Sequence, residues 1–174
     1  MFIDVDVDPR TEPPLASDEK AMLVGFLRWY RETLELKCSD LDAEQLARRS
    51  VEPSTMSLLG LVRHMAEVER AWFRRTLARQ DAPPIYRSDV LVDGEFEGAV
   101  ADDACVADAW ARWREEVAFA EGFVNDAPNL DITGSTSRRD VSLRWVLVHM
   151  IEEYARHIGH ADLLRERIDG RLGQ

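Results

Sequence analysis

Four long stretches of the chain carry apolar residues at every third or fourth position, and polar segments with Pro or Gly separate them. This spacing is typical of amphipathic helices. We predict long helices from Ser17 to about Lys37, from Ser57 to about Gln80, from about Asp103, and from Ser142 to about Ile168, with Gly170 closing the last. Long helices with intervening loops indicate an all-α protein, a four-helix bundle.

The connections differ in length and composition. A short helix is expected after Asp42, before the break at Pro53. The segment from Asp81 to Val100 holds two prolines and two glycines and lacks helical periodicity. Such a long connection is usually either functional or mobile. A second loop, residues 127–140, leads into the last helix.

The length of 174 residues favours one bundle domain over residues 17–170, with a lead over 1–16 and a tail over 171–174. The net charge of −11 argues against nucleic acid or an anionic membrane as a partner. The chain has no apolar run of spanning length and no signal segment, so we expect a soluble, cytoplasmic protein. A homodimer through outer helix faces is compatible with the pattern, which singles out no face.

The only two cysteines, Cys38 and Cys105, are far apart and form no CxxC motif. A disulfide framework or a cysteine-based zinc site is therefore not expected. We interpret both residues as small, buried or incidental thiols.

The chain contains an internal similarity that involves its four histidines. The segment SLLGLVRHMAE, Ser57 to Glu67, resembles SLRWVLVHMIE, Ser142 to Glu152, and the second segment continues into His157 and His160. The similarity predicts two related helical hairpins in which the histidine-bearing helices are equivalent members.

Helix geometry places several of these side chains together. An α-helix advances about 100° per residue, so positions three, four, eight and eleven apart share a face. One face of the last helix therefore carries His149, Glu153, His157 and His160, while His64 and Glu67 share a face of the second long helix. If the two faces meet, His64, Glu153 and His157 supply two nitrogens and one carboxylate oxygen. That set suits Zn²⁺ or another divalent transition metal with open positions.

A buried polar cluster, in which the carboxylate holds two imidazoles, is the alternative to a metal site. We favour the metal because an unpaired buried carboxylate is costly and one ion accounts for all three residues. His149 is expected to hydrogen-bond near the ligands. His160 is open between a contact to a ligand, a place in the cavity wall and direct ligation. Glu67 is open between a bond to a ligand histidine, direct metal binding and a solvated charge.

The residues STMSLLGLVRHMAEVERAWF and VLVHMIEEYARHIGHADLLRERIDG carry a resemblance to a known family. Over nearly its whole length the chain resembles the DinB/YfiT-like metalloenzyme superfamily, in particular the small actinobacterial proteins labelled DUF664, close to the mycothiol-dependent maleylpyruvate isomerases. The resemblance implies a four-helix bundle with His64, Glu153 and His157 as metal ligands. The wider superfamily has histidine at the position of Glu153, whereas the isomerase-like branch has glutamate.

This resemblance also implies a chemistry. An open-sided metal lowers the pKa of a bound thiol or water and polarises a carbonyl. The isomerase-like branch uses a low-molecular-weight thiol, and the near absence of lysine beside many arginines indicates a GC-rich source, which favours mycothiol. We therefore predict a metal-dependent thiol S-transferase or isomerase that acts on a small electrophile, with Zn²⁺ preferred over Ni²⁺. Arg63, Arg144 or Arg156 would steer substrate carboxylates if they border the pocket.

Two other functions remain open from the sequence. A metal-dependent hydrolase would use the same ligands with water as the nucleophile. A metal-stabilised binding or stress-response bundle without turnover would close the coordination sphere with a fourth protein ligand such as His160 or Glu67.

Overall fold

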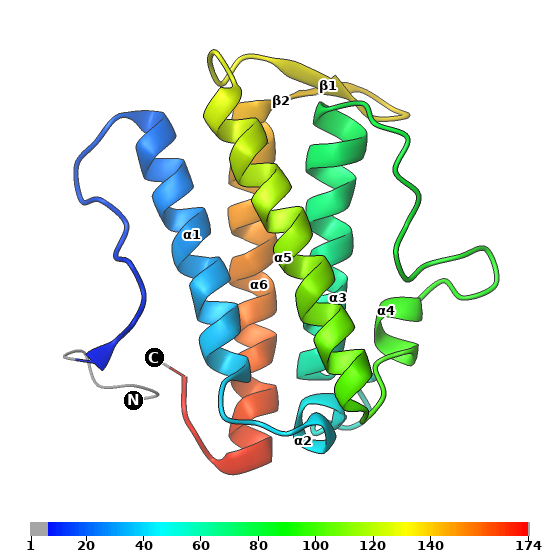
Figure 1. Cartoon of the computed structure of the whole chain (residues 1–174). Helices are drawn as coiled ribbons and strands as arrows, with labels where there is room; N and C mark the ends of the chain where they lie inside the picture. Colours follow the sequence, from blue (N-terminus) through cyan, green and yellow to red (C-terminus); the bar gives the residue numbers. More distant parts are fainter. Residues whose placement is uncertain (1–6, 174) are drawn as a thin grey trace.

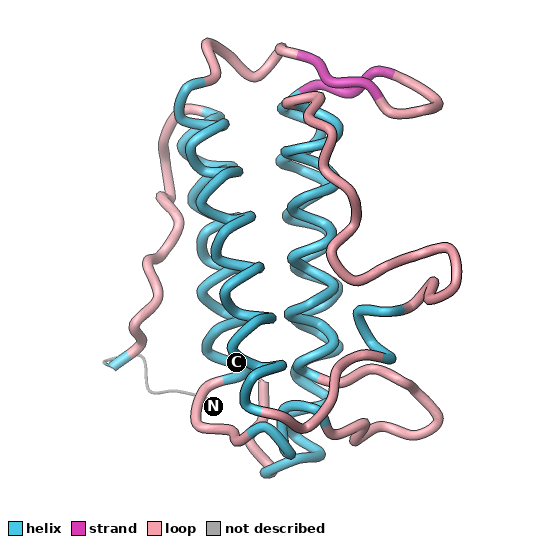
Figure 2. Tube along the Cα trace, turned by 45° about the vertical axis from the view of Figure 1, so that its right-hand side comes forward, coloured by secondary structure: helices cyan, strands magenta, loops and turns pink. Residues whose placement is uncertain are grey.

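The computed structural model describes residues 7–173. Its long elements are α1 (Glu19–Cys38), α3 (Leu58–Glu69), which continues as η2 (Arg70–Leu77), α5 (Asp103–Asp126) and α6 (Leu143–Asp169). These helices lie side by side (Figures 1 and 2), and none of the described helices is long and apolar enough to cross a bilayer. The expected all-α class is confirmed. Residues 1–6 of the predicted lead and Gln174 of the predicted tail lie outside the described residues.

Serine and glycine mark the ends of the two histidine-bearing helices, as the sequence predicts. The hydroxyls of Ser57 and Ser142 accept hydrogen bonds from backbone amides of the first turns of α3 and α6. Gly170 ends α6 with a φ of 79°, in the left-handed region that glycine adopts without a steric penalty.

The start of α1 differs from the prediction by one residue. Asp18, and not Ser17, is the N-cap, and its side chain accepts from the amide of Ala21. Both residue types cap helices well, and the aspartate adds a negative charge that the helix N-terminus favours.

The second long helix changes character halfway. Residues Arg70–Leu77 form a π-helix, η2, in which the Thr76 hydroxyl also donates to the carbonyl of Ala71 at 2.9 Å. Hydrophobic spacing alone did not distinguish this wider turn from a regular helix, so the sequence predicted one continuous element. π-Helical turns are frequent at functional sites because they change which side chains share a face.

The short helix α2 (Ala43–Ala47) lies where the sequence predicted it. The two longer connections contain short elements that the hydrophobic pattern did not reveal. The 81–100 connection includes α4 (Gly94–Glu97). The loop before α6 contains an antiparallel hairpin of β1 (Thr133–Ser135) and β2 (Asp140–Ser142), which covers one end of the helices (Figure 1). The hairpin packs tightly on η2, since a Cβ on Gly134 would lie 2.2 Å from the carbonyl oxygen of Thr76.

The core between the long helices contains a buried polar network. Arg31 of α1 makes two hydrogen bonds of 2.8 Å to Glu69 of α3, and the Tyr154 hydroxyl of α6 donates to Glu69 at 2.8 Å. Trp113 of α5 donates to that hydroxyl at 2.9 Å. Burial and the Glu69 carboxylate hold the pKa of Tyr154 well above its ordinary value, so the phenol remains a donor. One residue from each long helix thus meets in a single network.

Both cysteines are free thiols, as expected. Cys38 is buried in the core, and burial raises its pKa to about 12. Cys105 is partly buried and its Sγ lies 3.5 Å from the carbonyl oxygen of Gly98.

Candidate metal centre

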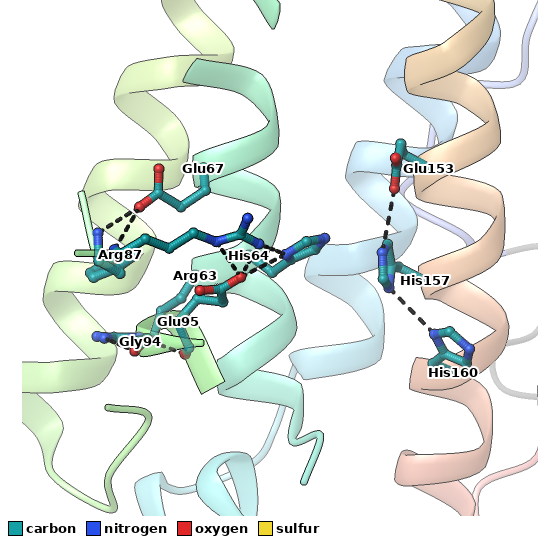
Figure 3. Close-up of polar contacts among 10 residues, drawn as sticks. Arg63, His64, Glu67, Arg87, Gly94, Glu95, Glu153, His157 and His160 are labelled. Carbon is teal, nitrogen blue, oxygen red and sulfur yellow. Dashed lines mark hydrogen bonds and ion pairs between the residues drawn. The ribbon is translucent and has the colours of Figure 1, made fainter. Parts of the chain in front are cut away.

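Within residues 7–173, three side chains are placed as metal ligands would be: His64, Glu153 and His157. One ligand atom of each lies within 4.8 Å of the others, and all three side chains are partly buried. His64 comes from α3, while Glu153 and His157 are one turn apart on the facing side of α6 (Figure 3). These are the three residues that helical spacing and the family resemblance singled out.

The two histidines each have one ring nitrogen engaged away from the centre. His157 Nδ1 lies 3.3 Å from His160 Nδ1, while its Nε2 lies 3.5 Å from Glu153 Oε2. His64 Nδ1 lies 3.2 Å from Glu95 Oε1 and 3.3 Å from Arg87 Nη2. Because metal-bound histidines usually have their second nitrogen held by another group, this geometry leaves Nε2 of both rings for an ion.

The surroundings of His157 favour its neutral form. Burial, the neighbouring His64 and His160 rings and Arg156 lower the pKa of His157 to about 4. A neutral imidazole keeps the lone pair that a metal ligand needs.

His149 lies beside the candidate ligands and holds one of them. Its Nε2 is 3.2 Å from Glu153 Oε1, so the carboxylate bridges His149 and His157. The His149 ring packs on Trp72 and Trp145, with centroid distances of 4.8 and 4.9 Å. Neither His149 nor His160 belongs to the group within 4.8 Å.

Glu67 takes a role that none of the sequence alternatives described. Its side chain is 4 % exposed, so the solvated alternative is wrong. Its Oε1 accepts hydrogen bonds from the backbone amides of Tyr86 and Arg87 at 2.6 and 3.3 Å. Glu67 therefore fixes the beginning of the 81–100 connection against α3.

The same connection brings two residues to the centre that the sequence analysis did not identify. Glu95 is fully buried, and its Oε1 accepts from Arg87 Nε at 2.7 Å as well as contacting His64. The length of the connection was a signal of function. Periodicity gave no means to distinguish Glu95 from the exposed acidic residues around it.

A cleft of about 410 Å³ is lined by two of the three candidate ligands, His64 and Glu153. It is lined by His64, Glu67, Val68, Ala71, Trp72, Arg75, Thr76, Pro84, Arg87 and Glu153. A groove of about 540 Å³ near Phe119 and Phe123 is larger, but no histidine lines it. The smaller cleft is therefore the one in which ligand-type side chains and open volume coincide.

The three arginines that would steer a substrate if they bordered the pocket do not line this cleft. Arg63 is buried under the connection, Arg144 pairs with Glu19 at 2.7 Å and with Asp131, and Arg156 pairs with Glu152 at 3.2 Å. The cleft instead has Arg75 and Arg87 in its wall.

Comparison with models of known protein families identifies the family of this chain. A family model described as mycothiol-S-transferase matches residues 22–170, which confirms the resemblance to DinB-like, mycothiol-related proteins. Comparisons with curated proteins and with solved structures gave no match. The match spans most of the 174 residues, including both histidine-bearing helices. The chain belongs to the mycothiol-S-transferase family.

Proposed function

We propose that this protein is a metal-dependent S-transferase, or a related isomerase, that joins mycothiol to or exchanges it on a small electrophile. The observation that carries the proposal is the approach of His64, Glu153 and His157 to within 4.8 Å at the edge of a cleft. Membership of the mycothiol-S-transferase family supports the thiol and the transfer reaction.

The donor set fits a divalent transition metal. Two imidazole nitrogens and one carboxylate oxygen are common ligands of catalytic Zn²⁺, which keeps a further position for an exogenous ligand. Ni²⁺ accepts the same donors. When bound, the ion lowers the pKa of a thiol or water that it contacts, so that a nucleophile is present at neutral pH.

Residues around the candidate ligands hold the ligand side chains in place and form the wall of the cleft. His149 holds Glu153 through its Nε2 at 3.2 Å, and His160 lies 3.3 Å from His157, so the two α6 ligands are held from both sides. Trp72 and Thr76 of η2 form a wall of the cleft, against which the apolar part of a substrate can pack.

The geometry favours an open site over a closed structural one. His160 contacts a ligand ring and Glu67 accepts from backbone amides, and neither residue belongs to the group within 4.8 Å, which supports a site with three protein ligands. A structural zinc site would be closed by four protein ligands. The choice between thiol and water as the nucleophile depends on what enters the cleft, and the experiment below separates a transferase from a hydrolase.

Metal content and thiol response test the proposal together. We expect the protein, purified without chelator or affinity metal, to carry about one divalent metal per chain by elemental analysis. Mycothiol should then change the absorption spectrum of the Co²⁺-loaded protein. Metal without a thiol response would favour the hydrolase or a structural site, and absence of metal would overturn the proposal.

Variants of the two candidate ligands on α6 localise the metal. Glu153→Ala and His157→Ala should reduce bound metal to near background with helix content retained by circular dichroism. Glu166→Ala is the control because Glu166 is an exposed glutamate of the same helix, α6. Glu152 is unsuitable because it contacts His149, which holds Glu153. An unchanged metal content in Glu153→Ala and His157→Ala would contradict the ligand assignment.

A further inference from the structure

The 81–100 connection is attached to α3 at its beginning by one carboxylate. Glu67 binds the backbone amides of Tyr86 and Arg87, as described above, and this contact lies three residues from His64 on the same helix face. The beginning of the connection is thus positioned from the helix that carries a candidate metal ligand.

The end of the connection is attached to α3 by an arginine. Arg63 Nε donates to the carbonyl of Glu95 at 2.9 Å, and its Nη2 donates to the carbonyl of Gly94 at 3.0 Å. The guanidinium also lies over the Tyr86 ring, 3.8 Å from its centroid. Arg63 therefore fixes the backbone from which the Glu95 side chain extends.

Between these two attachments, Glu95 reaches His64. Its side chain is fully buried, its Oε1 lies 3.2 Å from His64 Nδ1 and accepts from Arg87 Nε, and its Oε2 has no hydrogen-bond partner (Figure 3). Arg87 Nη2 lies 3.3 Å from the same His64 Nδ1, so a protonated Nδ1 donates to Glu95, whereas an unprotonated Nδ1 would accept from Arg87. The Glu95 carboxylate is therefore placed to accept a hydrogen bond from His64 Nδ1.

We infer that Glu95 is a positioning residue that accepts the Nδ1–H of His64 and so presents the Nε2 lone pair of His64 to the metal. The inference rests on the proposed function, because it concerns the metal that His64, Glu153 and His157 would hold. A carboxylate on the second nitrogen of a ligand histidine fixes both the tautomer and the ring orientation.

The same contact ties metal binding to the position of the connection. Glu95 reaches His64 only while residues 86–95 lie against α3. A metal on Nε2 strengthens the Nδ1–H bond to Glu95, so the ion and the attached conformation favour each other reciprocally.

Paired glutamine variants of the full chain test the inference. Glu95→Gln removes the negative charge with almost no change in shape, and Glu97→Gln is the control because Glu97 is an exposed residue of the same helix, α4. Competition with a chromophoric chelator should show Zn²⁺ affinity reduced by roughly 10- to 100-fold in Glu95→Gln and unchanged in Glu97→Gln. Circular dichroism checks that both variants fold.

Two spectroscopic measurements report positioning itself. In the metal-free, unaltered chain, ¹⁵N spectra of the imidazoles should show the Nδ1–H tautomer of His64, and Glu95→Gln should show a mixture. Zn²⁺ should slow amide hydrogen exchange at Tyr86 and Arg87 in the unaltered chain and do so less in Glu95→Gln.

The outcomes separate this inference from the proposed function. If the unaltered chain binds Zn²⁺ and Glu95→Gln binds it equally well, the positioning role is overturned and the metal site stands. If the unaltered chain binds no divalent metal, both are overturned. If Glu95→Gln does not fold, the tautomer of His64 in the unaltered chain decides, and Nε2–H would overturn the inference.

Discussion

His157 is surrounded by groups that oppose a positive charge on its ring. The side chain is largely buried, and the His64 and His160 rings and Arg156 lie near it, so its pKa falls to about 4. The same low pKa that keeps the lone pair for a metal makes protonation of His157 costly in the folded state.

This depressed pKa predicts an acid-sensitive fold in the absence of metal. Between about pH 4 and the unfolded value of about 6.5, the unfolded chain binds more protons at this residue, so stability falls as the pH decreases through that window. Below that window, the full loss in the free energy of unfolding is about 3 kcal/mol. Urea unfolding with EDTA at several pH values should show this slope, and the His157→Gln variant should show a flatter one. If the unaltered chain and His157→Gln showed the same dependence of stability on pH, the lowered pKa of His157 would be contradicted.

At the scale of elements, equivalent residues of the two similar segments, Ser57–Glu67 and Ser142–Glu152, make different contacts. His64 belongs to the candidate metal centre, whereas the equivalent His149 packs against two tryptophans and holds Glu153. Glu67 attaches the connection, whereas the equivalent Glu152 forms a surface ion pair.

The sequence predicted the features of this molecule that depend on residues close together in the chain. Helical periodicity and the serine caps gave the long helices, and spacing on α6 gave the relation between Glu153 and His157. Glu95 was not predictable in this way, since it lies 31 positions from His64 and its approach depends on carbonyls bound by Arg63. The π-helix was missed because its apolar residues satisfy the regular helical pattern.

The docking of the hairpin on η2 predicts opposite effects for two glycines. Gly134→Ala should destabilise the protein by about 1–3 kcal/mol, because its Cβ would lie 2.2 Å from a backbone oxygen of Thr76. Gly122→Ala is the control. It lies in α5 with nothing within 4 Å of an added Cβ, and it should stabilise by about 0.5–1 kcal/mol. Thermal unfolding measures both. A Gly134→Ala variant as stable as the parent would show that the hairpin can move off η2.

At the scale of the whole molecule, the buried network of Arg31, Glu69, Tyr154 and Trp113 ties the long helices together. No member of this network was predicted from the sequence to take part in a shared polar contact. Their partners lie on different helices, so periodicity along one helix carries no information about the pairing. Because every hydrogen bond fixes a distance between helices, the network sets their register.

Removal of the central carboxylate should therefore affect the whole fold. Glu69→Ala leaves the Arg31 charge buried without its main partner, and we expect a loss of about 3–5 kcal/mol. Trp113→Phe removes one donor and part of a buried ring, and it should cost less, about 1–3 kcal/mol. Urea denaturation of both variants checks the ranking, and a Glu69→Ala variant as stable as Trp113→Phe would show that the charge pair contributes little.

The position of Trp72 should make the fluorescence of the protein sensitive to ligand binding. Its indole lines the cleft and touches both His149 and Trp145, so a molecule that enters the cleft changes the polarity around one of the five tryptophans. Indole emission shifts with the polarity of its surroundings, and a neighbouring imidazole quenches it. The unlabelled protein therefore carries a built-in fluorescent reporter for screening thiols and electrophiles, and subtraction of a Trp72→Phe signal isolates it.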